Sequence, residues 1–194
     1  SHIIFLDLFD KIYIKKSSKD TIKIIGPFDN LLNSKKGDNL ITKTLEFCRN
    51  VELTNSKFNI TLEKNIPVSA GLGGGSSNSA SIIRYFLNSK KICDVEKIIN
   101  DSKSLGADVP SCIHSKPIFM EGIGEKISFV DINKNLDIGI VLINPYIELS
   151  TKEVFSRWLP ENKIISKEKI LKVNVLQDFL EISNIGNDLE DSAI

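Results

Sequence analysis

The sequence predicts an α+β fold, in which strands and helices share the chain without regular alternation. Runs with alternating apolar and polar residues indicate strands, and other runs carry apolar residues at helical spacing. The 194-residue chain is 41% apolar and 26% charged, which is ordinary for a globular protein with a sizeable core. Because these runs do not follow a strict strand–helix–strand order, we expect mixed packing rather than repeated βαβ units.

The first expected elements are two strands and a helix. Residues 3–15 and 21–25 alternate apolar and polar side chains, and a Gly-Pro turn signal closes the second run. Residues 38–51 carry apolar side chains at helical spacing. We expect Asp38 to cap this helix, since a short acidic side chain at that position accepts from the first free amides.

The middle of the chain predicts a strand over 58–63 and helices over 79–87 and 95–104. Strands are expected over 116–120 and 125–129, on either side of a Gly-Ile-Gly turn.

A strongly apolar run, 136–143, predicts a further strand, which Asn144-Pro145 would end. Beyond it the pattern becomes helical. We therefore expect a domain boundary near Asn133–Asn135.

Charge and composition exclude several classes of function. The 25 basic and 25 acidic residues give a formal net charge of zero, so nothing favours binding to nucleic acid or to an anionic membrane. No apolar run is long enough to span a bilayer, and we expect no signal peptide. We expect Cys48, Cys93 and Cys112 to be reduced, mostly buried thiols of a cytoplasmic protein. His2 and His114 lack nearby cysteines or paired carboxylates, so we expect no metal site there.

The segment from Pro67 to Asn78 (PVSAGLGGGSSN) is the most informative part of the chain. Its glycines permit positive φ angles and the close approach of a ligand to the backbone. The following Ser-Ser-Asn can cap a helix and leave its first amides pointing into the loop, where the helix dipole favours phosphates. The alternative is a flexible Gly/Ser linker, although linkers rarely lie between a strand and an amphipathic helix.

The two commonest phosphate motifs do not match this segment. A Walker A loop ends in Gly-Lys-Ser/Thr, whereas these glycines run directly into Ser76. A dinucleotide fingerprint that starts at Gly71 needs Gly or Ala where Ser76 stands.

The second chemical candidate is Asp108, in the segment Leu105-Gly-Ala-Asp-Val-Pro110. Val109 precedes a proline, so we expect it to be extended and to fix the backbone beside the carboxylate. A carboxylate near a phosphate loop can orient or deprotonate the acceptor hydroxyl in phosphoryl transfer. The alternative is that Asp108 only caps a helix.

These segments resemble a known superfamily of small-molecule kinases. The glycine-rich segment is similar to the phosphate motif of the galactokinase, homoserine kinase, mevalonate kinase and phosphomevalonate kinase superfamily. The triple glycine with Ser-Ser-Asn resembles most the family that phosphorylates 4-diphosphocytidyl-2-C-methyl-D-erythritol in the non-mevalonate isoprenoid pathway. Further matches, in the family's order, are 5–10, 38–41, 105–110, 121–125 and 187–190.

The resemblance implies an ATP-dependent kinase that uses Mg²⁺. Asp108 matches the family's catalytic aspartate, which acts on the 2-hydroxyl of the substrate, and either Ser76 or Ser77 is implied to contact Mg²⁺. The positions that match the ATP site are Asn39, Lys64, Pro67, Gly71, Leu72, Gly73, Gly74, Gly75, Ser76, Ser77 and Asn78.

Two further residues match positions near the cytidine of the substrate, namely Thr151 and Phe155. A flat aromatic ring suits that place because it can stack on a base. The alternative is that Phe155 packs in a core beside Val154 or Trp158.

The resemblance also implies a two-domain kinase fold. Residues 1–134 would form an ATP-binding domain similar to a ribosomal-protein domain, and 135–194 would begin an α/β sandwich on the substrate side. Compared with the family, both ends are expected to be truncated, because a first strand and a third glycine-rich motif find no match.

We expect a cytoplasmic monomer or homodimer that acts on a small molecule. Two alternatives stay open. One is a sister kinase that acts on another alcohol, such as homoserine or mevalonate. The other is a non-catalytic nucleotide-binding or RNA-binding module, although zero net charge disfavours RNA.

Overall fold

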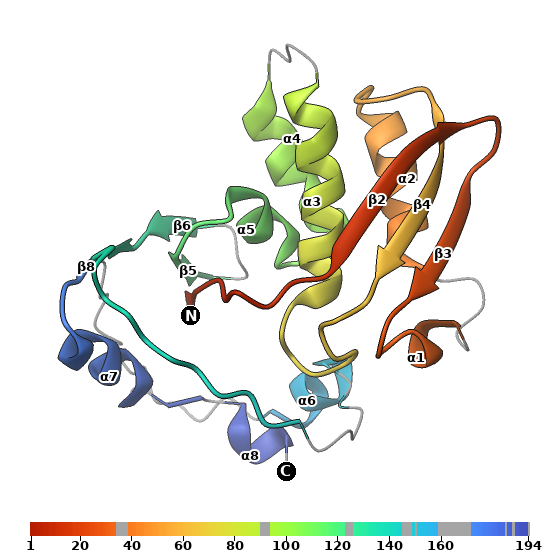
Figure 1. The fold of residues 1–194 in the computed structure, drawn as a ribbon. Coiled ribbons are helices and arrows are strands. Elements are labelled where there is room, and N and C mark those ends of the chain that lie inside the picture. Colours follow the sequence, from red (N-terminus) through yellow and green to blue (C-terminus); the bar gives the residue numbers. More distant parts are fainter. Residues whose placement is uncertain are drawn as a thin grey trace. The chain divides into compact units, whose positions relative to one another are not determined.

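The computed structural model describes residues 1–33, 39–89, 94–122, 126–144, 149, 151–158, 172–184, 186–187 and 189–193 (Figure 1). The chain divides into two compact units. The glycine-loop unit comprises Leu6–Val68 and Leu72–Ser115. The C-terminal unit comprises Ser1–Phe5, Ser69–Gly71 and Lys116–Ile194. The boundary near Asn133–Asn135 stays a prediction.

A three-stranded sheet forms one side of the glycine-loop unit, with β4 (Lys57–Glu63) between β2 (Lys11–Ser17) and β3 (Thr21–Ile25) (Figure 1). β4 runs antiparallel to β2 and parallel to β3. Side chains at every second position of β4 are buried, as the alternating pattern predicts. The strands predicted over 21–25 and 58–63 are therefore confirmed.

The single strand predicted over 3–15 is wrong, because the chain there forms two strands in different sheets. β1 (His2–Ile3) pairs with β5 (Ile118–Glu121) in the C-terminal unit, whereas β2 pairs with β4. Residues 4–10 between them have no regular secondary structure. Alternation reports which side chains are buried but not which strand lies alongside.

Helices pack against the sheet and against one another. They are α1 (Asn30–Asn33), α2 (Leu40–Asn50), α3 (Gly74–Asn88), α4 (Val95–Asp101), the 3₁₀ turn η1 (Ser102–Ser104) and α5 (Val109–His114). Their apolar faces meet the sheet in one core, which includes Leu45 of α2, Ile60 of β4 and Ile83 of α3. The helices predicted over 79–87 and 95–104 are confirmed in place, and the second ends as a 3₁₀ turn.

Two local predictions about helix starts are wrong. The N-cap of α2 is Asn39, whose Oδ1 accepts from the Ile41 amide at 2.9 Å, whereas Asp38 lies outside the described residues. Val109 is the first residue of α5 and not extended. Pro110 is tolerated in the first turn because the amide it lacks would have no partner within the helix.

The C-terminal unit has two small sheets. β5 and β6 (Lys126–Phe129) lie where the strands over 116–120 and 125–129 were predicted and pair antiparallel, and residues 123–125 are outside the described part. β7 (Asp131–Ile132) pairs in parallel with β8 (Lys172–Val173). The helices of this unit are α6 (Thr151–Arg157), α7 (Leu176–Asn184) and α8 (Glu190–Ala193).

The strand predicted over 136–143 is wrong. Residues 136–144 have no regular structure, and the side chains of Val141 and Ile143 are 87% and 90% exposed. No strand in the described part of the chain pairs with this run, and an apolar run without a partner cannot satisfy its backbone amides and carbonyls as a strand.

The described residues contain no helix with the length and apolar character that crossing a bilayer requires. They also contain no group of three or more His, Cys, Asp and Glu side chains that is arranged to hold a metal ion. Cys48 and Cys112 are free, buried thiols, and burial raises their pKa values to about 12 and about 11. Cys93 lies outside the described residues.

Candidate active site

The glycine-rich segment passes directly into α3, and Gly73 makes the transition. Gly73 is the N-cap in the left-handed region, with φ 65° and ψ 15°. A Cβ at this position would meet none of the described residues within 4 Å, so the requirement for glycine is conformational and the backbone here is open. Leu72, just before it, is 39% exposed. The second half of the segment, from Gly74 to Asn78, is therefore the start of a helix and not part of a Gly/Ser linker.

The expectation that Ser76-Ser77-Asn78 caps the helix is wrong, because α3 begins at Gly74, two residues before Ser76. The serines consequently do not cap it, and no side chain does. The first helical bond within α3 runs from the Ser77 amide to the Gly73 carbonyl, at 2.9 Å. The amides of Gly74, Gly75 and Ser76 come earlier and have no acceptor within the helix. Uncapped amides at the positive end of a 15-residue helix are suited to binding an anion.

The turn that carries Asp108 lies against this first turn of α3. A Cβ on Gly106 would be 3.5 Å from Ser76 Oγ, and α3 packs along α5. Asp108 occupies the N-cap position of α5, but its side chain makes no capping hydrogen bond. The capping alternative therefore does not explain this residue. Asp108 is exposed, and its carboxylate is available for other chemistry.

Lys64 lies beneath the start of α3, and its ammonium is buried. The side chain is 4% exposed, and a Cβ on Gly74 would be 3.2 Å from Lys64 Nζ. Burial lowers the pKa of the Lys64 ammonium, and the hydrogen bond and charge of Asp10 offset part of that effect. Lys64 Nζ donates to Asp10 Oδ2 at 2.6 Å, and Asn78 Nδ2 donates to the same oxygen at 2.8 Å.

Asp10 is the residue of this region that sequence reasoning missed. It belongs to the segment 5–10 that matches the kinase family, but an acidic residue just before a strand does not reveal its partners. Those partners lie 54 to 68 residues away along the chain.

The other predicted ATP-site residues are divided between the two units. Asn39 caps α2, and a Cβ on Gly75 would be 3.4 Å from the Leu40 side chain, so α2 and α3 begin side by side. Pro67 is half-buried between β4 and the glycines. Gly71 has φ 69° and is assigned to the C-terminal unit. The functional roles of these residues stay predictions.

Thr151 and Phe155 lie on α6 of the C-terminal unit. Phe155 is 56% exposed, while its neighbour Val154 is the buried residue, at 7%. The alternative that Phe155 is a core residue is therefore wrong. Its contact with a cytidine stays a prediction.

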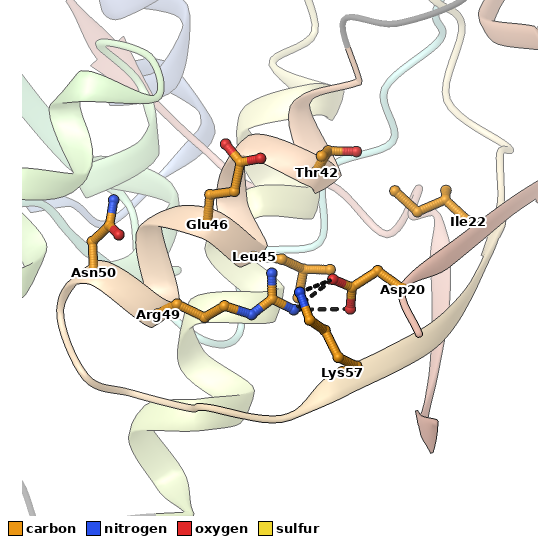
Figure 2. Close-up of a pocket in the computed structure, with 8 residues that line it drawn as sticks. All are labelled: Asp20, Ile22, Thr42, Leu45, Glu46, Arg49, Asn50 and Lys57. Carbon is orange, nitrogen blue, oxygen red and sulfur yellow. Dashed lines mark hydrogen bonds and ion pairs between the residues drawn. The ribbon is translucent and has the colours of Figure 1, made fainter. Parts of the chain in front are cut away.

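A separate cavity of about 310 Å³ opens along α2 and contains no predicted site residue (Figure 2). The Asp20 carboxylate lies 2.8 Å from Arg49 Nη2 and 3.1 Å from Lys57 Nζ, and it accepts from the Phe58 amide at 2.9 Å. Lys57 opens β4, whereas the glycine loop follows the other end of that strand. The charges of this cavity are mostly paired with one another. These ion pairs and hydrogen bonds join α2 to the sheet, so the cavity is a structural feature and not the proposed reaction site. The residues that line the cavity are Asp20, Ile22, Thr42, Leu45, Glu46, Arg49, Asn50 and Lys57.

Asp20 makes the stability of the fold depend on pH. Partial burial raises the pKa of this carboxyl, but hydrogen bonds from Phe58, Lys57 and Arg49 outweigh burial and hold the pKa below its ordinary value of 3.8. A lowered folded-state pKa stabilises the protein above the unfolded-state value, and this contribution disappears as the pH falls through the folded-state value. We expect urea unfolding midpoints to fall on acidification in the wild type, and less steeply in Asp20→Asn. Parallel pH profiles would contradict this assignment.

Comparison with known proteins shows to which family this chain belongs. Residues 39–116, which include the glycine loop and Asp108, match the GHMP kinases N terminal domain. A protein of Persephonella marina named 4-diphosphocytidyl-2-C-methyl-D-erythritol kinase is 33% identical over 194 residues, which cover 97% of this chain and 68% of that protein. The chain belongs to the 4-diphosphocytidyl-2-C-methyl-D-erythritol kinase family. The resemblance predicted from the motifs is confirmed.

Other relatives of the 4-diphosphocytidyl-2-C-methyl-D-erythritol kinase family agree. The Agrobacterium fabrum protein of the same name is 36% identical over 162 residues, or 80% of this chain and 52% of that protein. The chain thus spans about half the length of several curated relatives it matches, with 51% of the Rhodopseudomonas palustris protein as another example.

Solved structures confirm the fold. A crystal structure of 4-(cytidine 5'-diphospho)-2C-methyl-D-erythritol kinase has a TM-score of 0.51 at 22% identity, covering 78% of this chain and 52% of that one. Homoserine kinase from Cytophaga hutchinsonii has a TM-score of 0.52 at 14% identity, covering 91% of this chain and 56% of that one. The α+β prediction is therefore confirmed as the GHMP kinase fold of this kinase family.

Proposed function

We propose that this chain supplies the ATP site and the catalytic carboxylate of a kinase that phosphorylates the 2-hydroxyl of 4-diphosphocytidyl-2-C-methyl-D-erythritol. The observation that carries the proposal is the uncapped start of α3 beside the turn that bears Asp108. The names of the curated relatives supply the substrate.

In this proposal the amides of Gly74, Gly75 and Ser76 hold phosphate oxygens of ATP. They are uncapped at a helix N-terminus, where the dipole adds to their attraction for an anion. The open backbone at Gly73 lets the phosphates approach closely. Asn39, at the neighbouring start of α2, contributes to the same site. Pro67, Gly71 and Leu72 complete the loop around the nucleotide.

Ser76 and Ser77 are the side chains that fit a Mg²⁺ ion bound to the phosphates. Both carry hydroxyl oxygens, which suit a hard cation, and Ser76 Oγ lies beside the turn that carries Asp108. An ion held there would neutralise charge on the transferring phosphoryl group.

Asp108 acts on the acceptor hydroxyl. Its exposed carboxylate has no capping bond to break before it accepts the proton. The hydroxyl oxygen then forms a bond to the γ-phosphorus of ATP as the bond to the β-phosphate oxygen breaks, which releases ADP. Positioning and charge neutralisation supply most of the rate in such a direct displacement.

We assign the substrate cytidine to Thr151 and Phe155, because the Phe155 ring is exposed and can stack on a base. We further propose a cytoplasmic enzyme, monomeric or homodimeric, with residues 1–134 as an ATP-binding domain similar to a ribosomal-protein domain. Residues 135–194 would begin the substrate-side domain.

The test is an assay of the full-length protein with ATP and Mg²⁺ against three alcohols: the cytidine-linked methylerythritol, homoserine and mevalonate. We expect ADP release and a phosphorylated product with the first alcohol only. Turnover of homoserine or mevalonate alone would assign a sister kinase. Nucleotide binding without turnover of any of the three would leave a non-catalytic binding module.

A further inference from the structure

The buried carboxylate of Asp10 accepts hydrogen bonds from residues before and after the glycines of the loop. The Asp10 side chain has 0% exposure. Its Oδ1 accepts from the backbone amides of Asn65 and Ile66, at 2.7 and 2.8 Å. Its Oδ2 accepts from Lys64 Nζ and Asn78 Nδ2, at 2.6 and 2.8 Å. A carboxylate has about four acceptor positions, so these four donors use its full capacity.

Three of the donors come just before the glycine-rich segment, and the fourth is the last residue of that segment. Lys64, Asn65 and Ile66 follow the end of β4, and Asn78 lies in the second turn of α3. A Cβ on Gly74 would be 3.1 Å from Ile66 Cγ2 and 3.2 Å from Lys64 Nζ, so the start of α3 rests directly on the groups that Asp10 binds. The carboxylate therefore fixes the start of α3 relative to the end of β4.

The negative charge of Asp10 is needed to stabilise the buried ammonium of Lys64. Lys64 places an ammonium in a buried position at the positive end of α3, and both burial and the helix dipole disfavour a cation there. Burial lowers the pKa of Lys64, and Asp10 is the group that counters this. Without the carboxylate, the ammonium would have to move or lose its proton, and the first turn of α3 above it would move too.

We propose that Asp10 is a positioning residue of the ATP site. By holding Lys64, Asn78 and the Asn65–Ile66 backbone, it keeps the amides of Gly74–Ser76 in the geometry that phosphate binding requires. Asp10 acts through these groups, since its carboxylate is fully enclosed by them. The inference rests on the proposed function, because it assumes that these amides bind ATP.

The test is steady-state kinetics of Asp10→Asn in the full-length protein, with both substrates varied. Asn keeps the shape of Asp and one acceptor oxygen, but it brings an amide donor to Lys64 and Asn78, which are themselves donors. We expect KM for ATP to rise roughly tenfold or more, as hydrogen bonds to a charged group are lost, and KM for the alcohol to stay unchanged. A role in stability alone would lower the amount of active enzyme and move neither KM.

Asp20→Asn is the matched control, because Asp20 binds β4 at its opposite end. It should lower the unfolding midpoint without changing KM for ATP. The double variant Asp10→Asn/Lys64→Met removes the unpaired buried cation, so it should recover thermal stability while KM for ATP stays raised. Lys64→Met alone is its reference, because Lys64 is itself a predicted ATP-site residue, and a higher KM for ATP in the double variant than in Lys64→Met gives the comparison if Asp10→Asn alone fails to fold.

The outcomes separate the two hypotheses. A wild-type enzyme that turns over ATP, with an unchanged KM for ATP in Asp10→Asn or in the double variant, would overturn the positioning role alone. An equal rise of KM in Asp20→Asn would also overturn it. A wild-type protein that neither binds nor turns over ATP would overturn the proposed function and this inference together.

Discussion

Replacing Asp108 by Asn is expected to lower kcat by about 10²- to 10⁴-fold, the usual cost of losing a general base or an orienting group. ATP affinity should be nearly unchanged, because the proposed phosphate contacts come from the amides of α3 and not from this side chain. Folding should also be preserved, since the carboxylate is exposed and makes no capping bond. Kinetics with saturating ATP, together with calorimetric titration of the nucleotide, would measure the two effects separately.

Asp94→Asn is the matched control for this experiment. Asp94 is a true N-cap, whose Oδ1 accepts from the Lys97 amide at 2.9 Å, and Asn caps a helix about as well as Asp. Neither turnover nor stability should change in this variant. If Asp108→Asn behaved in the same way, the catalytic assignment would have to be abandoned.

Replacing Gly26 by Ala is expected to give the largest loss of stability from a single added methyl group. Gly26 has φ 107°, and a Cβ there would lie 2.8 Å from the Lys64 carbonyl oxygen and 2.9 Å from the Lys64 amide nitrogen. The backbone conformation alone costs an L-residue about 1–3 kcal/mol, and the clash with main-chain atoms adds to this. The Lys64 amide also donates to the Ile25 carbonyl at 2.7 Å. Ile25 is the last residue of β3 and Lys64 directly follows β4, so the variant must disturb the ends of both strands.

Urea unfolding followed by circular dichroism would measure the loss of stability in Gly26→Ala. Gly139→Ala is the control, because a Cβ there meets nothing within 4 Å among the described residues, and its midpoint should stay within the usual range for a surface change. KM for ATP should rise in Gly26→Ala as well, since Lys64 is displaced from beneath Gly74. If Gly26→Ala unfolded at the same urea concentration as the wild type, the close approach of Gly26 to the Lys64 backbone would be contradicted.

The parts of the fold that were predictable from sequence are those where periodicity reports burial. β4 and α2 follow their apolar patterns because each places one face against the core. The start of α3 was misplaced because serine's preference for the N-cap was outweighed by a left-handed glycine, whose conformation the sequence does not specify. The apolar run 136–143 predicted a strand, but composition cannot supply the neighbouring strand.

Some residues of the candidate site could likewise be predicted from the sequence, and others could not. The glycine loop and Asp108 stand in local patterns with a chemical meaning, so both could be selected from the sequence. The carboxylate beneath the loop could not, because its donors come from distant segments that only the folded chain brings together. The exposed position of Phe155 next to a buried Val154 was likewise invisible, since both residues are apolar.

The central position of β4 has a consequence for how the protein folds. The neighbours in its sheet are β2 and β3, which precede it in the chain and do not pair with each other. Tyr13 pairs with Thr61, and Ile22 pairs with Ile60, so each ladder closes a long loop before it gains its first hydrogen bonds. A growing chain therefore exposes two unpaired strands until it reaches Glu63. The segment synthesised next is the glycine-rich segment, so the proposed nucleotide site is completed only after the sheet, and a nucleotide bound there would stabilise the folded unit.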